Sequence, residues 1–139
     1  MDLENAIAVL NQDGYTCVLA KGGVYHTSRE RGIKPLMDLL ERGGDYTQFS
    51  AADKVIGKAT AFLYVHLGIK RLYGQIVSQG ASEVLSRYGV EFTAGQLVPA
   101  IMNRRKDGYC PMESSVIHVG ELEEALPLIF ERYRQLNSK

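Results

Sequence analysis

The chain has no tryptophan, only two cysteines and no long apolar run. Two distant cysteines do not make the disulfide framework of a small secreted domain, so we expect both thiols to be reduced. No apolar run approaches the roughly 20 residues needed to span a bilayer. The acidic start, MDLENAIAVL, lacks the basic region of a signal peptide. These absences argue against a secreted or membrane-spanning protein and predict a cytoplasmic location.

A net charge is also missing, because 16 Lys and Arg residues balance 16 Asp and Glu residues. No global field therefore draws the chain to nucleic acid or to an anionic membrane, and we expect neither partner. The 139 residues, of which 45% are hydrophobic, fit one globular domain over residues 1–139. A chain of this length buries roughly two-thirds of its unfolded surface and can form a core of its own.

Apolar periodicity predicts alternating helices and strands. Gly22 and Gly23 separate two β-like runs, which predicts a hairpin near the start. Alternating helices and strands later in the chain imply parallel strands joined by right-handed crossovers. We therefore predict a three-layer α/β fold, in which helices flank a mixed sheet that begins as a hairpin. The expected helices cover 2–12, 31–44, 50–68, 79–89 and 121–136, and the expected strands cover 15–21, 24–28, 69–78 and 90–93.

The longest apolar-periodic segment is predicted to be the central helix, and it holds several candidate site residues. Ser50 and Asp53 have the spacing of a capping box at its start. Gly57 would cost about 1 kcal/mol inside a helix, which suggests close packing or room for a ligand. Two interpretations stay open. Either Asp53 caps the helix and Lys54 and Lys58 are solvated, or these residues line a cleft at the helix N-terminus that suits an anion.

Cys110 directly precedes Pro111, which favours the first position of a helix. Cys110 would then be the N-cap and Glu113 the third helical residue. Free backbone N–H groups and the helix dipole favour a thiolate there, and the basic residues 104–106 could add to the effect. Glu113 would oppose it. Cys110 is therefore either a functional thiol or a small, half-buried cap.

A metal site is not expected. Zinc needs three or four ligands, usually in close pairs. His26, His66 and His118 are scattered singly, and Cys17 lies inside an apolar run. No phosphate-loop motif occurs either, so we expect no cofactor.

The loop NRRKDG, residues 103–108, has two interpretations. Asn103 and Arg104 could grip a phosphate, but a basic run before Asp-Gly is also typical of a solvated turn.

Four stretches together carry a resemblance: RERGIKPLMDLL, ADKVIGKATA, VPAIMNR and CPME. They resemble a small family of uncharacterised prokaryotic proteins placed among the cytidine-deaminase-like folds, over roughly residues 15–125. The resemblance implies a mixed sheet flanked by helices, in the order already predicted from the apolar pattern. It also implies a cleft at the start of the central helix, where Cys110, Glu113, Asp53 and Lys58 could converge.

The sequence departs from a zinc deaminase at both metal-binding motifs. Such an enzyme needs H-x-E or C-x-E at the start of its central helix and P-C-x-x-C after the next strand. We place Ala52-Asp53-Lys54 at the first position and Ser78-Gln79-Gly80-Ala81 at the second. Neither offers the expected ligands, so the resemblance does not extend to zinc-dependent deamination.

The leading hypothesis is a small-molecule binding protein for a nucleotide-like or anionic ligand. The alternative is a metal-free enzyme with Cys110 as nucleophile. A third hypothesis, a redox sensor, lacks a nearby resolving cysteine. The eight tyrosines also offer surface for a homo-oligomer. The catalytic candidates are Cys110, Asp53 and Lys58, and the ligand-binding candidates are Lys54, Gly57, Asn103, Arg104 and Glu113.

Overall fold

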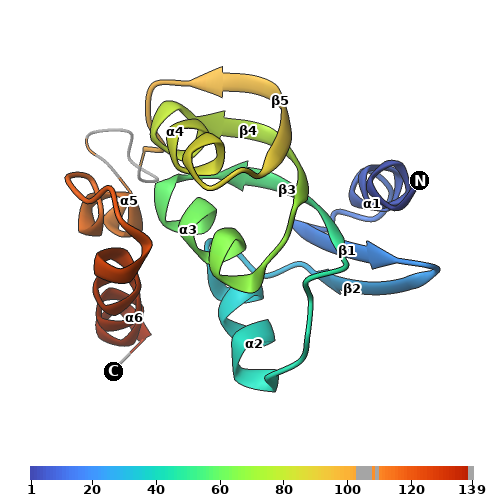
Figure 1. Ribbon diagram of the computed structural model, residues 1–139, viewed down its shortest axis with the longest axis horizontal. Coiled ribbons are helices and arrows are strands. Elements are labelled where there is room, and N and C mark those ends of the chain that lie inside the picture. The colour runs from blue at the N-terminus through green and yellow to red at the C-terminus, as the bar shows by residue number, and fades with distance from the viewer. Residues whose placement is uncertain (103–107, 109, 138–139) are drawn as a thin grey trace.

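The computed structural model describes residues 1–102, 108 and 110–137 (Figure 1). The helices are α1 (Asp2–Leu10), α2 (Lys34–Arg42), α3 (Lys58–Leu67), α4 (Gln79–Arg87), α5 (Pro111–Ser115) and α6 (Leu122–Asn137). The strands are β1 (Cys17–Lys21), β2 (Val24–Ser28), β3 (Ser50–Ile56), β4 (Arg71–Ser78) and β5 (Glu91–Val98). No helix within these described ranges is both long and apolar enough to cross a membrane.

The five strands form one sheet in the order β2-β1-β3-β4-β5. β1 is antiparallel to both β2 and β3, whereas β3, β4 and β5 are parallel to one another. The mixed sheet with an initial hairpin and later parallel crossovers is confirmed. β3 is the strand at which the antiparallel part of the sheet meets the parallel part.

Helices cover both faces of the sheet and make three layers (Figure 1). α1 packs alone on one face, where Ala6 and Leu10 are fully buried against Val18 and Ala52. The opposite face carries the larger core, to which α2, α3 and α4 contribute. α6 and α5 pack outside this layer, against α3. A three-layer α/β architecture is therefore confirmed.

Glycine and proline set several of the boundaries that the sequence predicts. Gly22 and Gly23 have φ angles of 53° and 86°, which lets two residues close the β1–β2 hairpin. Pro35 lies in the first turn of α2, and Gly43 ends that helix with φ 72°.

The predicted central helix over 50–68 is wrong in its first half. Ser50–Ile56 is strand β3, and α3 begins only at Lys58, with Gly57 as its N-cap. Ser50 and Asp53 therefore form no capping box. β3 is buried on both faces over most of its length. Its sequence therefore lacks the alternation of apolar and polar residues that is typical of a half-exposed strand. Periodicity alone does not separate such a strand from a buried helix.

One further expectation needs correction. β5 extends to Val98, beyond the predicted end at residue 93, because this edge strand is largely exposed and lacks a clear apolar pattern. α6 covers the predicted helix over 121–136 and contains Pro127 within its length.

Candidate functional site

A cavity of about 360 Å³ opens where β3 ends and α3 begins. The segment between β2 and α2 forms a second side, and α5 with the residues after β5 forms a third. Its lining includes Asp53, Gly57, Cys110 and Glu113. The cavity therefore draws on parts of the chain that are distant in sequence.

Asp53 is a buried carboxylate of this cavity, with only 7% of its surface exposed. It accepts a 2.6 Å hydrogen bond at Oδ2 from the hydroxyl of Tyr64 in α3. The backbone N–H of Val55 donates to Oδ1 at 3.2 Å. On β1, Cys17 is the register partner of Asp53, and its Sγ lies 3.2 Å from the Tyr64 hydroxyl oxygen. Three elements thus meet in one buried chain of polar groups.

Burial has the largest effect on the pKa values of these three hydrogen-bonded side chains. It raises the pKa of Asp53 to about 7, although hydrogen bonds from Tyr64 and two backbone amides act in the opposite direction. Burial likewise raises the pKa of Cys17 and of Tyr64 above their ordinary values, and the neighbouring Asp53 charge adds to both. Cys17 and Tyr64 are therefore neutral at physiological pH, and Asp53 is the group that titrates there.

Glu113 supplies the N-terminal hydrogen bond of α3. Its Oε2 accepts from the backbone N–H of Lys58 at 2.5 Å, and its side chain is buried. A carboxylate at this end of a helix also interacts favourably with the helix dipole. The position that the sequence suggested for an anion thus holds the carboxylate of the protein itself.

Gly57 leaves the space that Glu113 occupies. A Cβ at residue 57 would lie 2.7 Å from Glu113 Oε2 and 3.2 Å from a side-chain carbon of Ile101. Gly57 has φ −90° and ψ 178°, which any residue adopts. Glycine is required here for close approach and not for its backbone conformation.

The Lys58 side chain does not line the cavity. Its Nζ donates to the backbone carbonyl of Ile117 at 3.1 Å. Its Cδ lies 3.4 Å from the place where a Cβ of Gly80 would be, so the starts of α3 and α4 are adjacent. Lys58 therefore joins the helix starts to the segment after α5.

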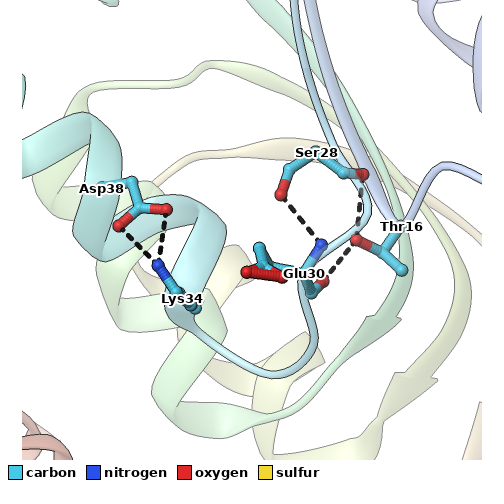
Figure 2. A network of polar contacts seen from close by, with 5 residues as sticks. All are labelled: Thr16, Ser28, Glu30, Lys34 and Asp38. Atoms are coloured by element: carbon cyan, nitrogen blue, oxygen red, sulfur yellow. Dashed lines mark hydrogen bonds and ion pairs between the residues drawn. The ribbon is translucent and has the colours of Figure 1, made fainter.

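The segment between β2 and α2 is fixed by a network of polar contacts (Figure 2). The Thr16 hydroxyl donates to the carbonyls of Ser28 at 3.1 Å and Glu30 at 2.5 Å, and the Ser28 hydroxyl accepts from the Glu30 N–H. In the first turns of α2, Lys34 pairs with Asp38 at 3.2 Å. The Thr16 contacts therefore hold the start of this wall against the residues before β1, whereas the Lys34–Asp38 pair lies within α2.

Cys110 is the N-cap residue of α5, as the sequence predicts. Its backbone N–H donates to the Ile101 carbonyl at 3.0 Å, and its carbonyl accepts from the Ser114 N–H. The thiol forms no side-chain cap hydrogen bond. It is half-buried, and it faces the same cavity as Asp53.

The structure brings most of the candidate residues together, without testing what they do. Asp53, Lys54, Gly57, Cys110 and Glu113 all line the cavity, and Lys58 contributes only its backbone N–H nearby. The two remaining candidates, Asn103 and Arg104, lie outside the described residues.

Sequence reasoning missed the two partners of Asp53. Tyr64 sits in a continuous apolar run, and Cys17 lies in an apolar strand, so neither position signals a polar contact. Only the pairing of β1 with β3 places Cys17 beside Asp53. Arg31 and Thr16, which also line the cavity, gave no signal either.

The residues predicted from the sequence at the start of the central helix are also corrected. Because α3 begins at Lys58, its first residues are Lys58-Ala59-Thr60 and not Ala52-Asp53-Lys54. Residues 78–81 do start α4, where the Ser78 hydroxyl accepts from the Ala81 N–H. Within the described part of the chain, no group of three or more His, Cys, Asp or Glu side chains is placed to hold a metal ion.

Comparisons with known proteins identify a family and a fold. The family model for a domain of unknown function, DUF1893 (TM1506), matches residues 5–132. The crystal structure of a DUF1893 family protein from Thermotoga maritima is similar, with a TM-score of 0.85 and 21% sequence identity. The match covers 94% of this chain and 89% of that one, and at this identity it shows the fold alone. No curated protein matches the chain.

The contact between Gly57 and Glu113 predicts that alanine lowers the stability of the protein at residue 57 but not at residue 80. Gly57→Ala displaces the Glu113 carboxylate from the start of α3, and we expect a loss of about 1–2 kcal/mol in the free energy of unfolding. Gly80→Ala is the matched control, because its Cβ meets Lys58 at an ordinary 3.4 Å. Alanine also favours a helix over glycine, so the control should be neutral or stabilising. Urea denaturation measures both, and equal effects would contradict this role of Gly57.

The raised pKa of Asp53 predicts that Asp53→Asn changes how stability depends on pH. The pKa of Asp53 is about 7 in the folded protein and near 3.8 in the unfolded protein. Ionisation of this group therefore costs more free energy in the folded state, and the fold is most stable while Asp53 is protonated. Wild-type stability should therefore fall as pH rises from about 4 to 7, by up to about 4 kcal/mol for this group. Asp53→Asn should lack that fall and gain on the wild type towards pH 8.

Urea denaturation between pH 4 and 8 measures this difference. Asp45→Asn is the control: hydrogen bonds from Thr47 lower the pKa of Asp45, so this group titrates below the range measured and the difference from wild type should be constant. A constant difference between Asp53→Asn and wild type at every pH would show that Asp53 does not titrate in this range.

Proposed function

The chain belongs to the DUF1893 family, a family of unknown function, and from this premise we propose that it binds a nucleotide-like small molecule in the cavity at the end of β3. The observation that carries the proposal is the buried Asp53 carboxylate on the wall of that cavity. A buried polar group in a mostly apolar cavity is typical of the few groups that orient a small ligand.

The position of the cavity in the sheet supports the proposal. In open α/β sheets, ligands bind outside the carboxyl ends of strands, where the order of strands changes direction. β3 is where the two parts of the sheet meet, because β1 pairs with it antiparallel on one side and β4 pairs with it parallel on the other. The cavity opens beyond its carboxyl end. Asp53 is the middle residue of β3, and its side chain lines the cavity that opens beyond the end of this strand.

The charges around the cavity favour a ligand with two different ends. Asp53 and Glu113 are buried, whereas Arg31 is exposed and Lys54 is half-buried. A hydrogen-bonding head group fits the buried acids, and an anionic tail fits the cations at the rim. Because Glu113 already occupies the start of α3, a phosphate would bind at the rim and not at the helix N-terminus. A nucleoside monophosphate has this distribution of groups.

We also propose that the family shares its ancestry with cytidine-deaminase-like folds. The sheet that begins as a hairpin and continues as parallel crossovers supports this relationship, as do the adjacent starts of α3 and α4. At those two starts, where a zinc deaminase has its metal ligands, this chain has Lys58 and Ser78. Their chemistry does not fit zinc, so the proposal contains no zinc-dependent step.

A panel of four compounds tests the proposed ligand. Adenosine 5′-monophosphate has both ends, adenosine lacks the phosphate, ribose 5-phosphate lacks the base, and inorganic phosphate is the anionic group alone. We expect the monophosphate to raise the melting temperature most, adenosine to raise it less, and the last two to have little effect. Thermal denaturation and calorimetry measure this order.

Two variants locate the site. Asp53→Ala removes the buried head-group contact and should reduce binding of the monophosphate and of adenosine alike. Glu91→Gln removes an exposed acid on β5 that pairs with Arg71, outside the cavity, and should bind as the wild type does. No stabilisation by any base-containing compound, or equal binding by Asp53→Ala, would contradict the proposed function.

The enzyme alternative rests on one observation, that Cys110 shares the cavity with Asp53. We expect iodoacetamide to label Cys110 and spare Cys17 in the folded protein, because Cys17 is only 3% exposed. Adenosine 5′-monophosphate should slow the labelling. Peptide mass spectrometry measures both sites, and labelling in urea is the control in which both react.

The pH dependence of that labelling decides between the two functions. A midpoint well below the free-thiol value of about 8.5 would favour Cys110 as a nucleophile. A midpoint at or above that value would leave Cys110 as a wall of the binding site. If adenosine 5′-monophosphate does not slow the labelling, Cys110 is not part of the site that binds this compound.

A further inference from the structure

The donor and the acceptor can be assigned in each hydrogen bond of the Tyr64 hydroxyl. The Tyr64 hydroxyl has a single proton, and that proton points to Asp53 Oδ2 at 2.6 Å. The 3.2 Å contact with Cys17 Sγ must therefore use the thiol as donor and the tyrosine oxygen as acceptor. The thiol thus donates to Tyr64, Tyr64 donates to Asp53 Oδ2, and the backbone N–H of Val55 donates to Asp53 Oδ1. Each carboxyl oxygen already accepts one donor of the protein, and a ligand would meet Asp53 from the cavity that it lines.

No cation among the described residues compensates Asp53. Their ion pairs do not include it. The charged groups that share the cavity are Lys54 on the same strand, Glu30 and Arg31 before α2, and Glu113 on α5. These two acids and two bases cancel, and Gly74, the register partner on β4, adds no charge. Burial therefore acts on Asp53 without an opposing salt bridge.

We propose that Asp53 binds the base of the ligand as a neutral carboxylic acid, donating a hydrogen bond from one oxygen and accepting one at the other. This inference rests on the proposed function and names the group that is recognised. The complementary edge has a ring nitrogen acceptor next to an amino donor, as in adenine and cytosine. A carboxylate, which only accepts, would pair with half of that edge.

Binding then takes up a proton whenever Asp53 is ionised in the free protein. The proton comes from solvent and lies between the carboxyl oxygen and the ring nitrogen in the complex. No covalent bond forms or breaks. With the pKa of Asp53 at about 7, the free site is mostly acid at pH 6 and mostly carboxylate at pH 8. Affinity should therefore fall about tenfold across this range, because the competent form becomes that much rarer.

Adenosine is the probe, since none of its own groups titrates between pH 6 and 8. Calorimetry at pH 8 in two buffers of different ionisation enthalpy should report uptake of about one proton per site. Asp53→Asn presents a fixed amide donor and carbonyl acceptor. We expect it to bind adenosine up to tenfold more tightly than the wild type at pH 8, with no dependence on pH. Asp53→Ala should lose binding at both pH values.

Two results with adenosine would overturn the inference and leave the proposed function intact. One is wild-type binding without proton uptake at pH 8. The other is loss of binding in Asp53→Asn as severe as in Asp53→Ala, which would show that the site needs a carboxylate.

A measurement without ligand tests the same inference. In protein labelled with ¹³C at the aspartate side-chain carboxyl, one resonance should titrate near pH 7 and be absent in Asp53→Asn. Tyr64→Phe removes a donor to the charged form and should move that midpoint upward. Cys17→Ser gives Tyr64 a stronger donor and should move it downward. A resonance of Asp53 that titrates near pH 4 would overturn the inference whether or not adenosine binds.

Discussion

The hydrogen bond from Tyr64 to Asp53 is the contact on which the site depends. A carboxyl group with 7% exposure is tolerated only if its oxygens are satisfied, and Tyr64 supplies the shortest of the bonds. That bond also ties α3 to β3, while the neighbouring thiol of Cys17 brings in β1. The floor of the cavity is therefore fixed by the same contacts that join the helix layer to the sheet.

Glu113 interacts with the second electrostatic feature of this region, the free N–H groups at the start of α3. The first N–H groups of α3 would attract an anion, and a buried carboxylate from α5 satisfies one of them across a separation of 55 residues. This contact holds α5 against α3 and forms one wall of the cavity. It also separates two acids that the sequence leaves together, because Glu113 maintains the start of α3 and Asp53 lines the cavity from β3.

Local signals in the sequence were enough to predict most of the fold. Glycine pairs, Pro35 and the Cys110-Pro111 step each act through the backbone of a few residues, and their elements form as predicted. β3 was mistaken for helix because its burial comes from layers on both sides, which is a property of the assembled fold. The same limit explains the site. Asp53 and Glu113 could be picked out as polar residues in informative places, but Tyr64 and Cys17 became partners only through strand pairing and helix packing.

The two ends of the cavity differ in what they contribute to recognition. Arg31 is exposed and Lys54 is only half-buried, so an ion pair with a ligand there adds little net free energy, typically about 0–1 kcal/mol. Asp53 is different, because a ligand that displaces water without offering the right partners leaves a buried polar group unpaired, at a cost of about 1–3 kcal/mol or more. In the proposed complex the rim holds the anionic tail, and the buried carboxyl group selects the ligand by its head group. The hydrogen-bonding state of one acid would then set the selectivity of the site.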